Sequence, residues 1–298
     1  MPNVINYATK FEKQIEQQYA KELTSSALAT NKKYNFINAK TIQIPTLVLT
    51  GYKDHVRDGS VNKGSVSNTY LPYALTHDRD ISFFVDDMDV DETNMVVSTA
   101  NITATFNSEQ AIPETDAYRY SKLYQNFKTN GGVVRTTALT AANILTEFDA
   151  MMEGMDEAGV PESGRILYLT PTNYTLLKNA EKIQRTLEAN GQAAALNRNV
   201  RSLDEVEIQK VPSDRLKTAY DFAEGFTPAV TAKQIRMILV HPATAVIAPV
   251  KVADVFVWVK GQTPQSAFGH LYQNRSYQDL FVIKQKNAGV AINAEAEV

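Results

Sequence analysis

Only a few residues in this sequence have types and spacings that could carry out chemistry. Asp87, Asp89 and Asp91 alternate within the acidic run 86–92, like the first ligands of an EF-hand calcium loop. The sixth position of that loop would be Glu92 where Gly is needed, and the twelfth would be Ser98 where Glu is needed. Calcium binding is therefore disfavoured. Because a helical pattern follows directly, we expect these carboxylates to favour a helix N-terminus.

Other catalytic and metal-binding patterns are missing from the sequence. The chain has no cysteine, which removes disulfides, thiolate zinc sites and cysteine nucleophiles. None of the four histidines lies three or four residues from another, so no helix presents a two-histidine metal face. We expect His55 and His77 to be solvated and His241 to be a satisfied loop residue, while His270 has no clear environment. No catalytic, cofactor-binding or metal-binding residue and no cofactor is predicted, and an enzyme has no positive support.

Composition and charge narrow the class of protein. The 298 residues are 44% hydrophobic and 21% charged, as in ordinary globular proteins. A net charge of −3 argues against general nucleic-acid binding, which needs a basic excess. Charges and prolines interrupt the most apolar stretch, 235–259, so it is not a membrane span. The N-terminus lacks the basic segment followed by an apolar segment that a signal peptide has. We therefore expect no membrane association, and a protein that stays in the cytosol unless it leaves in a particle.

The first 93 residues predict two elements that cannot bury their apolar residues alone. Apolar residues from Val4 to Leu23 recur at helical spacing, and this helix could dock on its own body or on another chain. Strand-like segments at 41–49, 70–75 and 81–85 flank a polar tip with three glycines, which predicts a long hairpin. The tip is either a mobile surface loop or an arm that reaches another chain. Residues 1–40 have a net charge of +3, and residues 41–93 have a net charge of −5.

The remaining chain mixes helices and strands without strict alternation, which predicts the α+β class. A long helix from residue 95 to 127 should kink or restart at Pro113. Thr140 should cap a helix over 141–154, and another helix should run from Pro171 to about Leu187. Strands are expected at 165–170, 206–211, 233–239, 245–249, 252–259 and 280–283. The aromatic residues of 268–281 could stack bases, but a strand pair packed on the core is the preferred interpretation.

The order of these elements resembles a known family. Its most specific parts are the strings Met-Asp-Val-Asp-Glu-Thr at 88–93 and Asp-Ala-Tyr-Arg-Tyr-Ser-Lys at 116–122. Over essentially its whole length the chain resembles the major capsid proteins of tailed bacteriophages and prophages, which have the Hong Kong 97-type fold. The resemblance implies an N-terminal arm at 1–38, an extension loop at 39–93 and a spine helix with peripheral domain at 94–134. It implies an axial domain at 135–249 and a return to the peripheral sheet at 250–298.

The resemblance also implies a function and partners. The subunit would assemble with itself, as pentamers and hexamers, into an icosahedral shell around double-stranded DNA. Scaffolding, portal and head-decoration proteins are possible partners, packaged DNA would be contacted non-specifically at most, and the product would lie in the virion after assembly in the bacterial cytoplasm. The chain begins almost at the arm, so a scaffold would be separate or already cleaved. Lys53 and Lys63 lie in the loop, but no matching Asn or carboxylate supports isopeptide cross-linking.

Two alternatives come from other classes of protein. An encapsulin-like compartment would share the fold and enclose an enzyme. A cytosolic α+β enzyme would be a monomer of 33.1 kDa with a pocket of convergent polar groups.

Overall fold

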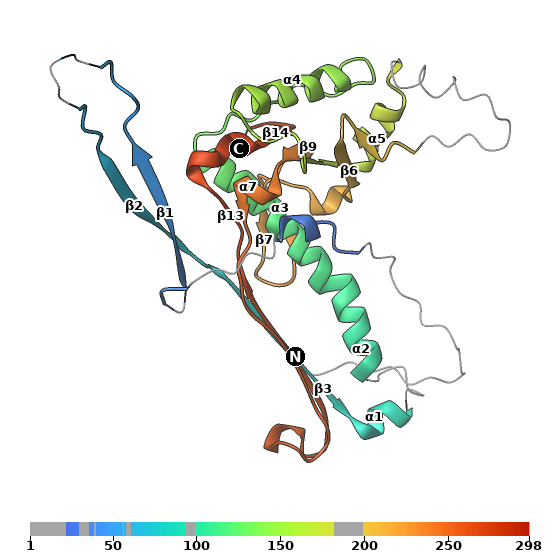
Figure 1. The fold of residues 1–298 in the computed structure, drawn as a ribbon. Helices are drawn as coiled ribbons and strands as arrows, with labels where there is room; N and C mark the ends of the chain where they lie inside the picture. The colour runs from blue at the N-terminus through green and yellow to red at the C-terminus, as the bar shows by residue number, and fades with distance from the viewer. Residues whose placement is uncertain are drawn as a thin grey trace.

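The structure is a computed structural model that describes residues 22–29, 36–38, 40–55, 57, 61–92, 99–181 and 199–297. The predicted helix between Val4 and Leu23 lies almost entirely outside these ranges, as does the part beyond residue 181 of the helix predicted from Pro171 to about Leu187. The described helix that begins at Pro171 ends at Lys178. A compact body carries two long β projections, one formed by β1 and β2 and the other by β3, β11 and β12 (Figure 1). The mixture of helices and sheets confirms the predicted α+β class.

A five-stranded sheet with the order β14-β9-β4-β6-β5 forms the centre of the body. Its inner strand β9 (Ile235–Val240) is almost entirely buried, as its mostly apolar sequence, interrupted by Arg236 alone, requires. Side chains alternate along β9, so Ile238 packs with helix α3 on one face while Leu239 packs with α4 and α5 on the other. The other strands of the sheet are β4 (Ile166–Leu169), β5 (Ser202–Leu203), β6 (Val206–Lys210) and β14 (Val290–Ala294). The helices that pack with Leu239 are α4 (Ile144–Glu157) and α5 (Pro171–Lys178).

The long helix is built in three parts. Helix α2 (Thr99–Phe106) leads into a π-helical turn at Asn107–Ala111, and α3 (Ile112–Thr129) follows without a break in the chain direction. The Ile112 N–H donates to Asn107 O, five residues back. Pro113 explains this irregularity, because its ring crowds the preceding turn and it has no N–H to donate. The predicted disturbance at Pro113 is therefore confirmed.

The first projection is a two-stranded hairpin. Strand β1 (Thr41–Leu49) pairs antiparallel with β2 (Val66–Ala74), from Thr41 opposite Ala74 to Leu49 opposite Val66. The predicted hairpin is thus present, but its second arm ends at Ala74. The segment 81–85, expected on the same arm, belongs to the second projection, because the chain turns at 75–76 and enters a different sheet.

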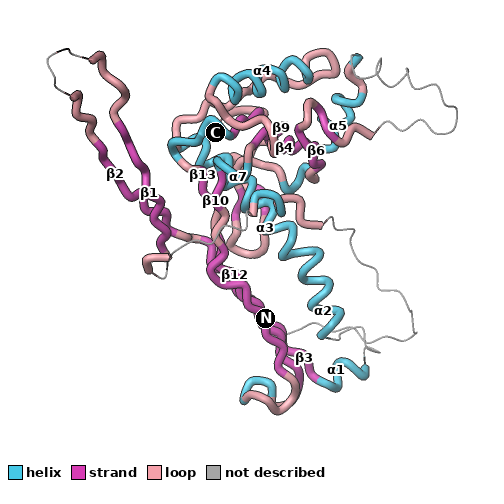
Figure 2. The backbone as a smooth tube through the Cα atoms, in the orientation of Figure 1, coloured by secondary structure: helices cyan, strands magenta, loops and turns pink. Residues whose placement is uncertain are grey.

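The second projection is a three-stranded ribbon, which lies beside α2 in Figures 1 and 2. Strand β12 (Gly269–Gln278) forms its centre, between β3 (His77–Asp86) and β11 (Val250–Trp258). The two outer strands come from segments more than 160 residues apart in the sequence. The preferred interpretation of 268–281, a strand pair packed on the core, needs correction, because β12 lies in the ribbon while β13 (Phe281–Val282) pairs with β10 (Val246–Ile247) in the body.

Several predicted boundaries need correction. Helix α4 begins at Ile144, because Thr140 and Asn143 bond to each other in a preceding turn (Asn143 N to Thr140 Oγ1, 3.3 Å). Strand β14 pairs with β9 in the central sheet, so residues 250–298 do not all return to the ribbon. The short elements are η1 (Ser26–Leu28), α1 (Asp87–Glu92), η3 (Ser213–Arg215), β7 (Tyr220–Asp221), β8 (Thr227–Pro228), α7 (Pro242–Ala245), β10 (Val246–Ile247), η4 (Pro264–Ser266) and η5 (Lys284–Gly289).

Candidate assembly surfaces

Nothing among the described side chains forms a cluster of three or more His, Asp or Glu residues suited to a metal ion. His77 was expected to be solvated, and this is wrong: it is 8% exposed and stacks on Tyr118 with ring centroids 3.7 Å apart. It is buried because β3 enters the body. His241 is satisfied, as predicted, with Nε2 3.0 Å from Ser163 O and Nδ1 2.8 Å from the Thr244 hydroxyl.

The acidic run is a helix and not a loop. Asp87 and Asp89 occupy the first turn of α1, so the helix that these carboxylates begin is α1 itself and not the later one. Lys260 Nζ donates to Asp87 Oδ2 at 2.8 Å, and His270 Nε2 lies 3.2 Å from Asp87 Oδ1. The hydrogen bond from Lys260 holds the pKa of Asp87 below its usual value. These contacts attach α1 to the end of the ribbon.

Both faces of the hairpin are uncovered. Leu47, Val48 and Leu49 are 61%, 57% and 61% exposed, although successive residues of a strand point to opposite faces. Tyr70 and Val66 on β2 are also exposed. An isolated two-stranded hairpin in water is marginally stable at best. Large apolar side chains exposed on both faces therefore indicate a surface that another molecule covers.

The ribbon has the same property along β11. Val255, Phe256 and Val257 are each about half exposed, again on both faces of the strand. Strand β11 is also an edge strand, because among the described strands it pairs only with β12. Among the described helices none is long and apolar enough to cross a bilayer. Exposed apolar edges of this kind are sites for pairing with protein.

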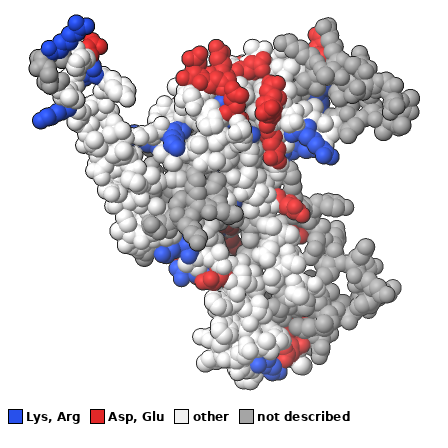
Figure 3. Space-filling view, in the orientation of Figure 1, with Lys and Arg blue, Asp and Glu red and all other residues white. Residues whose placement is uncertain are grey.

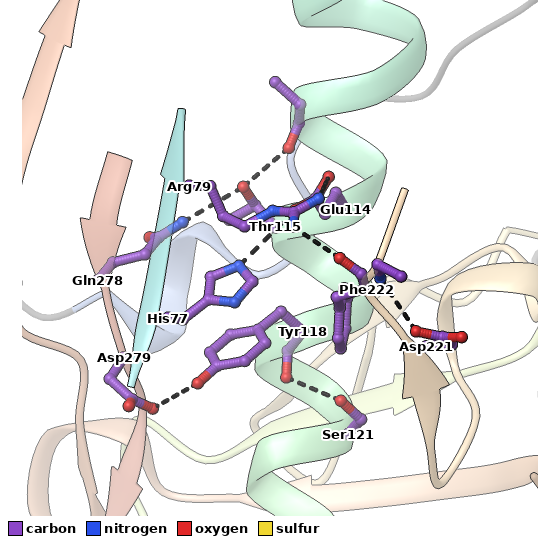
Figure 4. Close-up of polar contacts among 12 residues, drawn as sticks. His77, Arg79, Glu114, Thr115, Tyr118, Ser121, Asp221, Phe222, Gln278 and Asp279 are labelled. Carbon is purple, nitrogen blue, oxygen red and sulfur yellow. Dashed lines mark hydrogen bonds and ion pairs between the residues drawn. The ribbon is translucent and has the colours of Figure 1, made fainter. Parts of the chain in front are cut away.

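A polar network fixes the root of the hairpin, where β2 ends and β3 begins (Figure 4). Asp279 accepts hydrogen bonds from Thr76 N at 2.8 Å and from Tyr118 Oη at 2.8 Å. Tyr277 Oη donates to Leu75 O at 3.0 Å. The two-residue connection between hairpin and ribbon is thereby attached to α3 and to the end of β12. The direction in which the hairpin leaves the body follows from these bonds.

Charged groups lie on the other side of His77. Arg79 Nε donates to Glu114 Oε1 at 2.7 Å, and Arg79 Nη1 donates to Phe222 O at 2.6 Å. Burial and the nearby Arg79 lower the pKa of His77 to about 4. Burial raises the pKa of Glu114, against the opposing effect of Arg79. His77 is therefore neutral near pH 7, and it serves as a flat packing surface between Tyr118 and Phe222.

A cleft of about 410 Å³ opens beside this network, between the ribbon and the π-helical turn. Phe83 and Phe106 supply its apolar wall, 5.5 Å apart between ring centroids. Arg79 and Glu114 line it as well, but they are bonded to each other. The described lining residues include no nucleophile held by a general base, so the cleft does not support the enzyme alternative.

Asp116 forms a second junction, which connects the N-terminal segment to the body. Its carboxylate is fully buried and accepts from Thr24 N at 3.1 Å, Thr24 Oγ1 at 2.8 Å and Ser25 N at 2.9 Å. Arg215 Nη1 donates to the same group at 3.1 Å. One turn further along α3, Arg119 donates to Ser25 Oγ at 3.2 Å and to Gln278 Oε1 at 3.0 Å. We call these residues the Asp116 junction.

The sequence interpretation treated the string at 116–122 as a family marker without a role. The structure gives its members distinct contacts, since Asp116 and Tyr120 bond to Thr24, Tyr118 bonds to Asp279, and Arg119 bonds to Ser25. One signal in the sequence could have revealed this. Asp116 and Arg119 lie three residues apart, beside Tyr118 and Tyr120 of a predicted core helix, and charged groups buried at such positions need partners.

With this geometry described, the chain can be placed by its likeness to known structures. No family model matches it, and neither does any curated protein. Its fold is the α+β fold of phage capsid proteins, which confirms the fold class predicted from the sequence. The particular structures share little sequence with it, so they establish the fold alone.

Three of these structures show how complete the likeness is. The structure of Mycobacterium phage Che8 matches with a TM-score of 0.67 at 17% identity, over 97% of each chain. The capsid of cyanophage P-SCSP1u matches with a TM-score of 0.71 at 15% identity, over 98% of this chain and 93% of that one. The mature capsid of bacteriophage PhiM1 gives 0.68 at 14% identity, over 97% and 91%.

Proposed function

We propose that this protein is a major capsid protein that assembles with copies of itself into the head shell of a tailed phage. The observation that carries the proposal is the pair of β projections with both faces uncovered, on a fold shared with phage capsid structures. Burying apolar surface releases about 25 cal/mol per Å², and stable interfaces bury about 1,600 Å² in total. The exposed apolar side chains of the two projections are the described surfaces that such interfaces would bury.

The proposal assigns parts of the chain to assembly roles. Residues 1–38 form the N-terminal arm, 39–93 contain the extension loop, and 94–134 contain the spine helix of the peripheral domain. Residues 135–249 form the axial domain, and 250–298 supply β11 and β12 of the peripheral ribbon and β14 of the central sheet. Identical copies would form pentamers and hexamers, with scaffolding, portal and decoration proteins as further partners. The shell would be built in the bacterial cytoplasm and would be part of the virion.

Sizing the purified native protein tests this proposal. Light scattering should detect particles far larger than the 33.1 kDa chain, and negative-stain microscopy should show closed shells. Strictly monomeric protein at high concentration, under varied salt and with crowding agents, would contradict it.

The content of the particles separates the proposal from an encapsulin-like compartment. Particles isolated from a phage-producing host should contain nuclease-protected double-stranded DNA. Shells that contain a bound enzyme and no nucleic acid would favour the compartment instead. Material that remains monomeric and turns over a small molecule would favour an enzyme.

A further inference from the structure

Two buried polar atoms beside the Asp116 junction have no hydrogen-bond partner among the described residues. They are Arg119 Nε and Tyr168 Oη, and we call them the unpaired donors. Bulk solvent does not reach them, unlike most carboxylates of α4, which form the acidic area at the top of Figure 3. Buried polar groups in native proteins are almost always paired with protein or with ordered water, so these donors need an acceptor.

The rest of the Arg119 guanidinium is already engaged. Nη1 donates to Ser25 Oγ at 3.2 Å, and Nη2 donates to Gln278 Oε1 at 3.0 Å. Because the guanidinium is planar and its N–H groups have a fixed arrangement, these bonds also set the direction of the Nε–H group. Turning Nε–H toward another acceptor would break both bonds.

The unpaired donors come from different layers of the body and meet at Tyr120. Tyr168 lies on β4, the central strand of the sheet, and packs on the face that α3 covers. Its ring meets the ring of Tyr120 edge to face, with centroids 5.2 Å apart. Burial and the nearby Tyr168 raise the pKa of Tyr120. Burial lowers the pKa of Arg119, while the nearby carboxylate and the two tyrosines oppose this effect. The guanidinium and the two hydroxyl groups are therefore close enough to act on one another.

Tyr120 also provides an acceptor. Thr24 Oγ1 donates its only proton to Asp116 Oδ2 at 2.8 Å. The Tyr120 hydroxyl, 3.0 Å from Thr24 Oγ1, must therefore donate its own proton to that oxygen. Among the described residues nothing donates to Tyr120 Oη in return, so its lone pairs are available. The place where the three groups meet thus has two donors and one acceptor to satisfy.

We propose that one ordered water molecule is bound inside the protein at this place, where it accepts from Arg119 Nε and Tyr168 Oη and donates to Tyr120 Oη. Three bonds are the usual number for a buried water. The water joins α3 to the central sheet at the point where the Asp116 junction attaches the N-terminal segment. The proposal concerns the folded subunit and does not depend on the proposed function.

A halide ion fits the same place less well. It would satisfy the two donors, but it could not donate to Tyr120 Oη, and the lone pairs of that oxygen would face it. Burial, and after it the nearby Asp116, raise the pKa of Tyr168. The Asp116 carboxylate would therefore repel an anion bound to Tyr168.

The sign of the stability change in Tyr168→Phe tests the site. If Oη is bonded to water, its removal takes a bond from the folded protein, and the equilibrium constant for unfolding in urea should rise about fivefold. If Oη is unpaired in a dry core, its removal should lower that constant. Tyr174 provides the matched control, because it is buried on the opposite face of the sheet and its hydroxyl donates directly to Asn199 Oδ1 at 2.6 Å. Tyr174→Phe should raise the constant whether or not the water exists.

A double-mutant cycle tests whether one molecule joins the two tyrosines. The effects of Tyr168→Phe and Tyr120→Phe should differ from additivity by about twofold or more, because both variants remove a bond to the same water. The effects of Tyr168→Phe and Tyr174→Phe should be additive within about twofold.

Each outcome supports or overturns the proposal. A higher unfolding constant in Tyr168→Phe, coupled to Tyr120→Phe, supports it. A constant that is unchanged or lower, or a rise without coupling, overturns it. A high-resolution density map of the unaltered protein should show a solvent peak within hydrogen-bond distance of both unpaired donors. No peak, or a peak that bromide replaces, also overturns the proposal. None of these measurements requires shells, so failure of the proposed function would leave them interpretable.

Discussion

Replacing Asp116 by Asn should release the N-terminal segment and destabilise the body. The amide keeps the size of the side chain but removes its negative charge, so the buried ion pair with Arg215, which is 4% exposed, is lost. Breaking a buried ion pair by removing the charge of one member costs about 3–5 kcal/mol. At roughly 2–3 °C per kcal/mol for a protein of this size, the thermal midpoint of the unassembled protein should fall by about 10 °C.

Two measurements follow the effect, namely differential scanning fluorimetry for the midpoint and limited proteolysis for the segment. In the unaltered protein Ser25 and Leu28 are fully buried, so cleavage within 22–29 should be slow. In Asp116→Asn it should be at least tenfold faster. The exposed Asp149 provides the control, because Asp149→Asn should change stability by less than about 0.5 kcal/mol. A midpoint within 2 °C of the unaltered protein, with residues 22–29 still protected, would refute this account of the junction.

The remaining predictions concern pH, packing and assembly. Burial lowers the pKa of His77 from 6.5 to about 4, so the unfolded chain binds this proton more readily than the folded one, and the free energy of unfolding falls by up to about 3 kcal/mol as the pH drops from 6.5 to 4. Urea melts at pH 7 and pH 4.5 should therefore show a smaller loss of stability in His77→Phe than in the unaltered protein. An equal loss in both proteins would disprove the assignment. A Cβ on Gly269 would clash with Val85 O, so Gly269→Ala should lower the free energy of unfolding by about 2 kcal/mol in chemical denaturation. An unchanged free energy of unfolding would show that the backbone at the end of the ribbon can move to accept the methyl group. Replacing residues 46–69 by Asn-Gly should abolish assembly in light scattering but leave the melting of the body within 2 °C, and shells formed without the hairpin would contradict its role.

Local pattern was sufficient for much of the body. The apolar runs at 166–169 and 235–240 predicted buried strands because no other local arrangement hides them, and Pro113 predicted the irregularity of the long helix. Thr140 misled the prediction of the start of α4, because the sequence cannot distinguish a capping residue from one that closes the turn before it.

Long-range pairing explains what the sequence could not predict. The segment at 77–86 resembles another hairpin arm by composition, and its true partner β12 lies about 190 residues further along. The same holds for Asp116, whose donors come from residues 24, 25 and 215. A single sequence contains no local signal for such partners, so His77 was wrongly expected in solvent although Tyr118 covers it.

The root network around Asp279 and the Asp116 junction together hold both projections in fixed directions, although the surfaces of the projections are uncovered. The hairpin and β11 lack covering layers, so their own packing gives them little rigidity. Their directions are nevertheless fixed, because Asp279 attaches the hairpin root to α3 and to the end of β12. Asp116 and Arg119, on the same face of α3, attach the N-terminal segment and Gln278. Helix α3 is therefore the common reference for every projection, and the angles between neighbouring copies in a shell would depend on a few buried polar side chains of this helix more than on the larger apolar surfaces.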